Sequence, residues 1–347
     1  MATTFKEILE QLAESEDLNR DQSRFALGEI IEGNVSSEEA AAFLFGMRAK
    51  GETTGELTEF TKVMRKAAIP VNVPVEKAVD LCGTGGDASG TFNISTAAVF
   101  VVSGAGVPVL KHGNRSISSK CGSADVLEKL GAVASLHAPE VEKVFQDTGI
   151  AFMFAPNFHP AMKHIMPARR ALRMRTFFNI LGPLLNPAGV RRQVVGAYSR
   201  EAAGKMIQIL ANLETERAYT LHAHDGLDEV SLTTTTELFE LHSRLSTGSI
   251  TFDPASLGYK KVSPESLQGG DASANASIIR AITKDESTEA QRDIVLLNAA
   301  FGIHVSGISD SLEEASEMAK ESINSGAAAK ALKTFVTATK DHHPEKS

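Results

Sequence analysis

The sequence contains no tryptophan, only two cysteines and no long run of apolar residues. Cys82 and Cys121 are too few for a disulfide framework and match no metal-binding spacing, which indicates a reducing compartment. No stretch approaches the roughly 18 apolar residues of a transmembrane helix, and the first residues, MATTFKEILEQ, have no apolar segment of signal-peptide length. These absences predict a cytoplasmic protein without membrane contacts.

Positive charge is also scarce over the chain as a whole. There are 35 lysine and arginine residues against 43 aspartate and glutamate residues, a formal net charge of −8, which disfavours non-specific nucleic-acid binding. One interval departs from this: no acidic residue lies between Asp147 and Glu201, while arginine recurs there. Such a basic segment in an acidic protein predicts an anionic ligand, although Arg191, Arg192 and Arg200 are better explained as facing solvent.

A chain of 347 residues predicts two domains. Residues 1–69 show only helical spacing of apolar residues, and the prolines of segment 70–74 then break the pattern. Strands and helices alternate afterwards, with antiparallel strands expected over about 230–262. We expect an α/β protein: a small all-helical N-terminal domain (1–70, completed by helices from about 160–190) and a large α/β domain (75–345) with a mainly parallel central sheet.

The segment from Asp80 to Glu128 carries the clearest chemical signal. A predicted strand, 78–82, leads into GTGGD (83–87), and a helix is predicted to begin between Asn93 and Ser95. A second predicted strand, 107–110, leads into a basic loop, KHGNR, and a group of serines. Glycines expose backbone N–H groups, and a helix N-terminus adds unpaired donors and partial positive charge, so the segment predicts a phosphate-binding site.

Other interpretations of the glycine loop are weaker. A P-loop would require a lysine directly after the glycines, and none is there. The spacing Gly83-x-Gly85-x-x-Ala88 matches a dinucleotide site, but Lys111 stands where such a site needs an acidic residue for the ribose. A purely structural turn would not need so many polar residues, and Cys82 is better explained as a small buried side chain than as a nucleophile.

A second cluster of polar residues, HDGLDEV (224–230), follows the predicted strand 217–222. It brings Asp228 and Glu229 together, and two carboxylates about 4 Å apart repel by about 4 kcal/mol at an effective dielectric constant of ~20. The pair therefore favours a bound cation, and oxygen ligands beside a phosphate site indicate Mg²⁺. An exposed polar turn is the alternative interpretation.

Motifs along nearly the whole chain resemble the anthranilate phosphoribosyltransferase family. The motifs are GTGGD, FNIST, KHGNRSISSKCGSADVLE, NFHPAMKHIMPARRAL, RTFFNILGPLLNP, HDGLDEV, NAAFGIHVSG and ESINSGAAAKAL. The resemblance implies a glycosyltransferase of tryptophan biosynthesis that moves the 5-phosphoribosyl group of phosphoribosyl pyrophosphate (PRPP) to the amine of anthranilate and releases pyrophosphate. One departure from the family pattern L-G-x-R-T is Arg173, which replaces the glycine.

The resemblance also implies the site residues. PRPP would be surrounded by Gly83, Gly86, Asp87, Thr91, Asn93, Ile94, Ser95, Thr96, Lys111, His112, Gly113, Asn114, Arg115, Ser116, Ile117, Ser118, Ser119 and Ser123. Mg²⁺ would be handled by Ser95, Asp228 and Glu229, and anthranilate would contact Gly83, His112, Asn114, His159 and Arg169. The catalytic role, stabilising the departing pyrophosphate, would fall to Lys111, Asp228 and Glu229.

The resemblance further implies a homodimer and leaves open an association with a separate anthranilate synthase. Two rival functions stay in view. A nucleoside phosphorylase of similar fold would need a nucleobase pocket, whereas the KHGN motif with Arg169 suits a small aromatic carboxylate better. A catalytically inactive relative that binds nucleic acid is opposed by the net charge of −8 and by the intact GTGGD and Asp228–Glu229 motifs.

Overall fold

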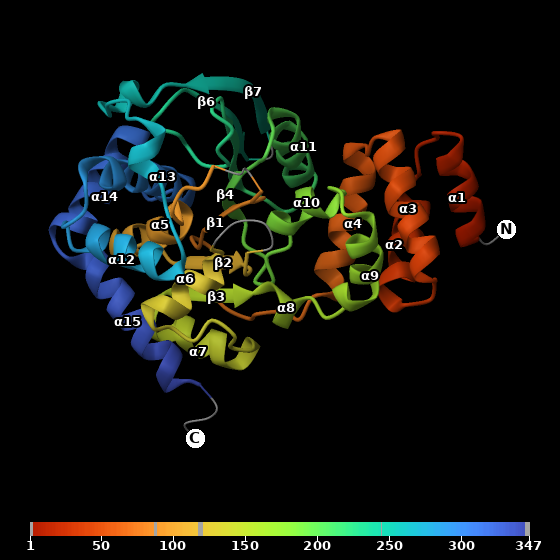
Figure 1. The fold of residues 1–347 in the computed structure, drawn as a ribbon, viewed down its shortest axis with the longest axis horizontal. Coiled ribbons are helices and arrows are strands. Elements are labelled where there is room, and N and C mark those ends of the chain that lie inside the picture. Colours follow the sequence, from red (N-terminus) through yellow and green to blue (C-terminus); the bar gives the residue numbers. More distant parts are fainter. Residues whose placement is uncertain (1–2, 87–88, 117–120, 244, 344–347) are drawn as a thin grey trace.

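The computed structural model describes residues 3–86, 89–116, 121–243 and 245–343. A helical domain lies at the N-terminal end of the molecule, and a larger α/β domain lies beside it (Figure 1). None of the helices within the described residues is long and apolar enough to span a membrane.

The N-terminal helices all begin in the same way. They are α1 (Phe5–Ala13), α2 (Arg20–Glu32), α3 (Ser37–Lys50) and α4 (Thr54–Ala67). At each start, the side chain before the helix and the side chain of the third helical residue accept hydrogen bonds from each other's backbone N–H groups. The sequence itself predicts two of these starts, because Ser36 and Thr53 are each followed three residues later by a glutamate, the spacing of a capping box, and the structure confirms both. Each such cap stabilises its helix by about 1 kcal/mol.

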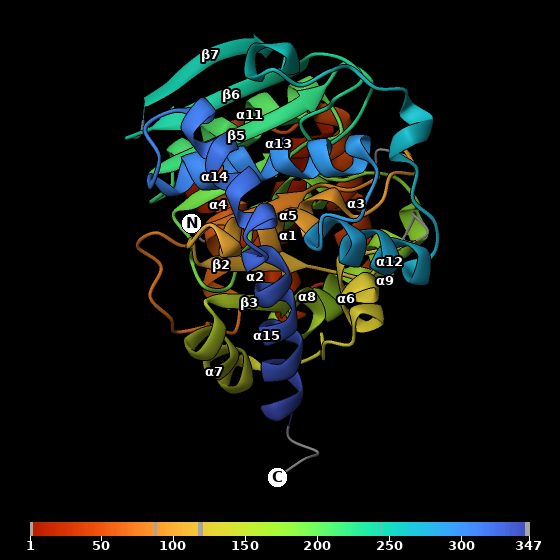
Figure 2. The same ribbon diagram turned by 90° about the vertical axis from the view of Figure 1, so that its left-hand side faces the viewer.

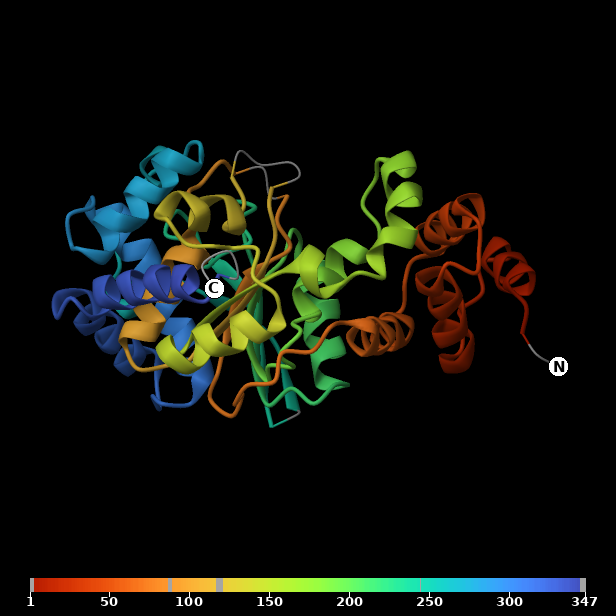
Figure 3. The same cartoon turned by 90° about the horizontal axis from the view of Figure 1, so that it is seen from below.

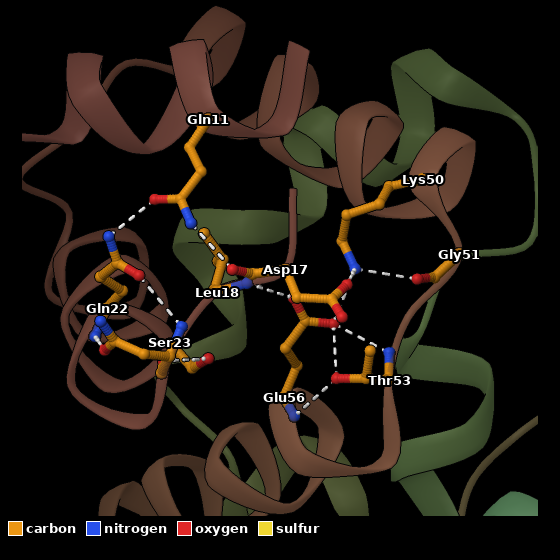
Figure 4. Close-up of polar contacts among 10 residues, drawn as sticks. Gln11, Asp17, Leu18, Gln22, Ser23, Lys50, Gly51, Thr53 and Glu56 are labelled. Carbon is orange, nitrogen blue, oxygen red and sulfur yellow. Dashed lines mark hydrogen bonds and ion pairs between the residues drawn. The ribbon is translucent and has the colours of Figure 1, made fainter. Parts of the chain in front are cut away.

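A buried ion cluster holds the helical domain together (Figure 4). Lys50 Nζ donates to Asp17 Oδ1 at 2.7 Å and to Glu56 Oε2 at 3.0 Å, and the side chains of Lys50 and Glu56 are 2% and 0% exposed. Glu56 Oε1 also accepts from the backbone N–H of Leu18 at 2.8 Å. The cluster therefore ties α3 and α4 to the connection between α1 and α2. Removing one partner would leave a buried charge uncompensated.

A later segment returns to the N-terminal helices. It contains α8 (Ala155–Phe158), α9 (Met162–Leu172), α10 (Phe178–Leu181) and the short helix η1 (Gly182–Leu184). α9 packs on α2 and α3. The centroid of the Phe177 ring lies 4.7 Å from that of the Phe60 ring and 6.2 Å from that of the Phe43 ring. Figure 3 shows this segment, coloured light green, between the α/β domain and the N-terminal helices.

The central sheet is mainly parallel. Strands β1 (Asp80–Gly83), β4 (Arg192–Gly196) and β5 (Arg217–Ala223) pair in parallel, and β6 (Thr236–His242) and β7 (Leu245–Phe252) extend this sheet as antiparallel strands. β2 (Val109–Gly113) and β3 (Ile150–Phe154) form a parallel pair, which a bridge between Val79 and Val109 places beside β1. The carboxyl ends of β1 to β5 therefore share one edge, which is where α/β proteins build their sites.

Helices cover both faces of the sheet. On one face, α5 packs against β1, and α13 packs against β4, β5 and α5; Figure 2 looks onto this face, with the N-terminal helices behind. On the other face, α11 contacts β5, β6 and α4. The remaining bounds are α5 (Ile94–Gly104), α6 (Ser123–Leu130), α7 (Ala138–Thr148), α11 (Arg200–Ala211), η2 (Pro254–Leu257), η3 (Pro264–Leu267), α12 (Ala272–Thr283), α13 (Glu289–Ser306), α14 (Leu312–Asn324) and α15 (Ala327–Asp341).

Two local expectations are wrong. The second strand spans 109–113 rather than 107–110, so Lys111, His112 and Gly113 are strand residues and not part of a following loop. Arg192 does not simply face solvent, because its guanidinium donates to Glu216 Oε2 at 2.8 Å and to the backbone oxygens of Glu76 and Val305. Both errors concern residues whose surroundings are set by distant segments.

Arg173 ends α9 in a strained conformation. Its φ of 50° and ψ of 32° lie in the left-handed region, which costs a residue with a side chain about 1–2 kcal/mol. Glycine adopts this conformation freely, so the departure from the L-G-x-R-T pattern falls at the one residue of this turn where glycine is favoured.

We predict that Arg173→Gly raises the free energy of unfolding by about 0.5–1 kcal/mol. The relief of strain exceeds the extra entropy that glycine gives the unfolded chain, about 0.5–1 kcal/mol. Arg170→Gly is the matched control: Arg170 is also exposed, but it lies within α9, where glycine costs about 1 kcal/mol. Urea unfolding of both variants measures the difference, and equal destabilisation by the two would contradict the assignment of strain.

Candidate functional site

The glycine loop after β1 is held by three other parts of the chain. The backbone N–H of Thr84 donates to Gly196 O at 2.9 Å, and the N–H of Gly85 donates to Asp228 Oδ2 at 2.7 Å. The oxygen of Gly86 accepts from Arg175 Nη2 at 2.8 Å. Gly85 and Gly86 have φ angles of 65° and 73°, so a residue with a side chain would be strained at either position.

The loop that carries Asp228 approaches the ends of β1 and β4 very closely. A Cβ atom added to Gly83 would collide with the Asp228 carboxylate, and one added to Gly196 would collide with the Asp228 backbone oxygen. Gly196 is absent from the residues predicted from the sequence, although a glycine at the end of a predicted strand is a signal of close backbone approach. These two glycines allow the acidic loop to reach the glycine loop.

Glu229 lies at the N-terminus of α5. Its Oε1 accepts from the backbone N–H of Ser95 at 3.0 Å. Burial and the neighbouring Asp228 carboxylate raise the pKa of Glu229, while Lys111 opposes that rise. Among the described residues no group of three or more His, Cys, Asp or Glu side chains is arranged to hold a metal ion. The two carboxylates with the Ser95 hydroxyl are an oxygen donor set of the kind that Mg²⁺ binds jointly with phosphates and water.

Lys111 supplies positive charge at the centre of the site. It is 4% exposed, and its Nζ donates to Leu81 O and to Ser95 Oγ, the latter at 3.3 Å. A buried ammonium group in this place offsets the charge of Glu229, which contacts the same serine. The structure therefore brings Lys111, Ser95, Asp228 and Glu229 together as predicted neighbours.

Two buried polar side chains, Asp80 and Asn186, form hydrogen bonds with the backbone of β2. The buried Asp80 carboxylate accepts from the backbone N–H of His112 at 3.2 Å and from Asn186 Nδ2 at 2.8 Å, and Asn186 Nδ2 also donates to Leu110 O at 2.8 Å. Burial raises the pKa of Asp80 to about 6. Neither residue is predicted from the sequence, because each acts through a segment far away in the chain.

Two buried histidines face each other near this end of β2. His112 Nε2 and His159 Nε2 are 3.2 Å apart, and the rings meet edge to face with centroids 5.1 Å apart. Burial, His159 and Lys111 lower the pKa of His112 to about 3, and burial lowers the pKa of His159 to about 4. Both imidazoles are therefore neutral at physiological pH, with one ring donating to the other.

Arg169 stands apart from this network. It lies on α9, and its guanidinium carbon is 5.1 Å from the centroid of the Phe178 ring. Burial lowers the pKa of Arg169. Within the described part of the chain no acidic side chain forms an ion pair with it. A half-buried guanidinium without an acidic partner is suited to an anionic ligand.

The other predicted residues fall into four groups. Arg115 is engaged by two acids of α6, at 3.0 Å from Asp125 and 2.5 Å from Glu128. Ile94 and Thr96 are 1% and 2% exposed, so they offer a ligand only their backbone. The structure places Thr91, Asn93, Asn114, Ser116 and Ser123 around the start of α5 and α6, where Asn93 Nδ2 donates to Cys121 O and Ser123 Oγ donates to Asn114 O. Asp87, Ile117, Ser118 and Ser119 lie outside the described residues.

Cys82 is the small buried side chain that the sequence analysis favoured. Its sulfur lies 3.7 Å from Pro183 O, and burial and the nearby Asp80 raise the pKa of its thiol well above the usual range. A thiol that resists ionisation is a poor nucleophile.

The chain is similar to known proteins over nearly its full length. Residues 6–68 match the glycosyl transferase family, helical bundle domain, and residues 75–329 match the glycosyl transferase family, a/b domain. An anthranilate phosphoribosyltransferase of Salinibacter ruber is 48% identical over 97% of this chain and 99% of its own. The crystal structure of anthranilate phosphoribosyltransferase from Thermus thermophilus has a TM-score of 0.90 and 35% identity, covering 96% of this chain and 99% of that one.

A Saccharomyces cerevisiae anthranilate phosphoribosyltransferase, solved in complex with PRPP and Mg, has a TM-score of 0.88 and 25% identity, covering 97% of this chain and 98% of that one. The similarity therefore spans both domains. The chain belongs to the glycosyl transferase family that these matches define and, within it, to the anthranilate phosphoribosyltransferases.

Proposed function

We propose that the chain transfers the 5-phosphoribosyl group of PRPP to the amine of anthranilate, giving N-(5-phosphoribosyl)anthranilate and pyrophosphate in tryptophan biosynthesis. The observation that carries this function is the meeting of the glycine loop, the N-terminus of α5, Lys111 and the Asp228–Glu229 pair at one edge of the sheet. Loss of anthranilate fluorescence in the presence of PRPP and Mg²⁺ tests it. A nucleoside phosphorylase would instead cleave nucleosides with phosphate and leave anthranilate unchanged.

The departing pyrophosphate needs more stabilisation than the backbone supplies. A helix N-terminus contributes about 0.3–2 kcal/mol, whereas enzymes lower barriers by at least about 8 kcal/mol. When bound, Mg²⁺ supplies positive charge that stabilises the leaving pyrophosphate. Asp228, Glu229 and Ser95 are the residues that would hold it, and Lys111, which donates to Ser95 Oγ, adds a fixed positive charge beside them. The site is thus built to neutralise developing negative charge.

The acceptor side of the proposal rests on Arg169. A guanidinium pairs well with a planar carboxylate such as that of anthranilate. The aniline amine is uncharged at neutral pH, so it needs positioning rather than deprotonation. His112 and His159 would line its passage as neutral groups, which leaves Arg169 as the charged partner of the carboxylate. Gly83 and Asn114 complete the proposed contacts.

The larger organisation also stays a proposal. We infer that the helical domain comprises residues 1–70 and is completed by helices from about 160–190, which the packing of α9 on α2 and α3 supports. The α/β domain would span 75–345. Family resemblance further favours a cytoplasmic homodimer and leaves open a separate anthranilate synthase as partner.

We predict that the double substitution Asp228→Asn/Glu229→Gln lowers kcat at least about 100-fold, the scale of losing an electrostatic stabiliser of the transition state. The amides keep the shape of the side chains but bind Mg²⁺ weakly. Activity as a function of Mg²⁺ concentration is the measurement, with anthranilate binding followed by calorimetry. Asp253→Asn, outside the site, is the control, since asparagine caps a helix as well as aspartate does. Full activity of the double variant in a chelator would contradict the magnesium assignment.

We predict that Arg169→Ala raises the KM for anthranilate ten- to 100-fold. A charge-assisted hydrogen bond contributes about 1.5–3 kcal/mol, and about 1.4 kcal/mol corresponds to a factor of ten. The KM for PRPP should change much less. Arg170→Ala, the exposed neighbour on the same helix, is the control. If Arg169 only joined the two domains, the KM values for both substrates would rise equally and the melting temperature would fall.

We predict that the neutral histidine pair makes the protein less stable as the pH falls. The folded-state pKa values of about 3 and about 4 lie below the usual 6.5, so the unfolded chain binds more protons between these limits. The stabilisation is complete above pH ~6.5 and decreases toward pH ~4, by up to about 1.4 kcal/mol per pH unit for each histidine. Urea unfolding between these pH values should show a flatter dependence for His112→Gln/His159→Gln. An unchanged slope would show that other groups cause it.

A further inference from the structure

Arg175 joins the helical domain to two loops of the α/β domain. It lies on the connection between α9 and α10, on the side of the N-terminal helices. Its Nη2 donates to Gly86 O at 2.8 Å, and its guanidinium carbon lies 4.4 Å from the centroid of the Tyr198 ring. Gly86 follows β1 and Tyr198 follows β4, so one side chain spans the carboxyl ends of two neighbouring strands.

The contact with Gly86 matters because the glycine loop has few constraints of its own. Residues 84, 85 and 86 each form one of the three hydrogen bonds described above, and each bond goes to a different part of the chain. The first two partners, Gly196 and Asp228, belong to the α/β domain. Arg175 is the anchor that comes from the helical side. The glycines provide no side chains that could replace it.

The orientation of the Gly86 carbonyl has an electrostatic consequence. A carbonyl oxygen that points at a phosphate repels it, whereas a carbonyl engaged by a guanidinium is directed toward the cation and partly neutralised. The guanidinium also lies over the Tyr198 ring, and this contact limits the motion of the group that donates the hydrogen bond. Arg175 therefore fixes the direction of the Gly86 carbonyl and, with it, the conformation of the glycine loop.

Resting on the proposed function, we propose that Arg175 is a positioning residue for PRPP, which orders the glycine loop through Gly86. The same connection begins at α9, which carries Arg169, the proposed contact of anthranilate. A shift of α9 would therefore move Arg175 and, through its hydrogen bond to Gly86, the loop that would bind PRPP.

The competing explanation is that Arg175 only attaches one domain to the other. If Arg175 only attached the domains, its loss would raise the KM values for both substrates and lower the melting temperature. If it positions the glycine loop, its loss would raise mainly the KM for PRPP. The two explanations therefore differ in which KM changes, and in whether the melting temperature changes with it.

The test compares Arg175→Ala and Arg175→Lys with Arg173→Ala, an exposed arginine on the same connection for which no ion pair or side-chain hydrogen bond is found in the described residues. We expect Arg175→Ala to raise both the KM for PRPP and the Kd of PRPP with Mg²⁺, measured by calorimetry without anthranilate, about tenfold. Arg175→Lys should give KM and Kd values for PRPP between those of the wild type and of Arg175→Ala, because lysine keeps the charge and a donor but loses the planar group over the Tyr198 ring. Arg173→Ala should leave both values unchanged.

Tyr198 provides a second, independent arm of the test. Tyr198→Phe keeps the ring under the guanidinium and should bind PRPP as the wild type does, whereas Tyr198→Leu should weaken PRPP binding about threefold. Unchanged PRPP affinity in Arg175→Ala would overturn the proposal, as would equal rises in both KM values with a lower melting temperature. If the proposed function were wrong, the wild-type protein itself would neither bind PRPP nor consume anthranilate, which is a different result.

Discussion

The close approach of Asp228 to the ends of β1 and β4 is the constraint on which the rest of the site depends. The approach is permitted only because residues 83 and 196 carry no side chain. It brings the acidic loop within hydrogen-bonding distance of Gly85, and the next residue, Glu229, then reaches the first turn of α5. Lys111 completes the arrangement from β2 by sharing Ser95 with Glu229. A single larger side chain at either glycine would displace the carboxylates from the anion site.

Much of this arrangement can be predicted from the sequence, because its residues lie in short motifs with a local physical meaning. The glycine run, the start of α5 directly after Asn93 and the paired carboxylates each indicate their chemistry without tertiary information. The strand 150–154 and the antiparallel strands after 230 also follow from local patterns. The resemblance to one family then assigned roles that periodicity and charge alone left open.

What could not be predicted depends on contacts between distant segments. The local pattern around Asp80 indicates an ordinary strand residue, yet it is a buried acceptor for His112 and Asn186. The need for a glycine at position 196 is explained only by its contact with the acidic loop. The role of Arg175 is explained only by its contacts with Gly86 and Tyr198. The predicted second strand begins two residues early and excludes Lys111 and His112 because they are polar, although both are buried. In each case the partner that decides the role lies far away in sequence.

The helical domain and one face of the sheet share a single hydrophobic cluster. Residues of α1–α4, of the segment 165–185 and of α11 pack in it together with Val195 of β4. This continuity limits how the protein can be recombined. A module that began at residue 1 and stopped at segment 70–74 would lack α9 and α10 and would expose the surface that they cover. An exchange of the helical domain between relatives would therefore have to replace two separate stretches of the chain at once, the residues before segment 70–74 and the segment that contains α9 and α10.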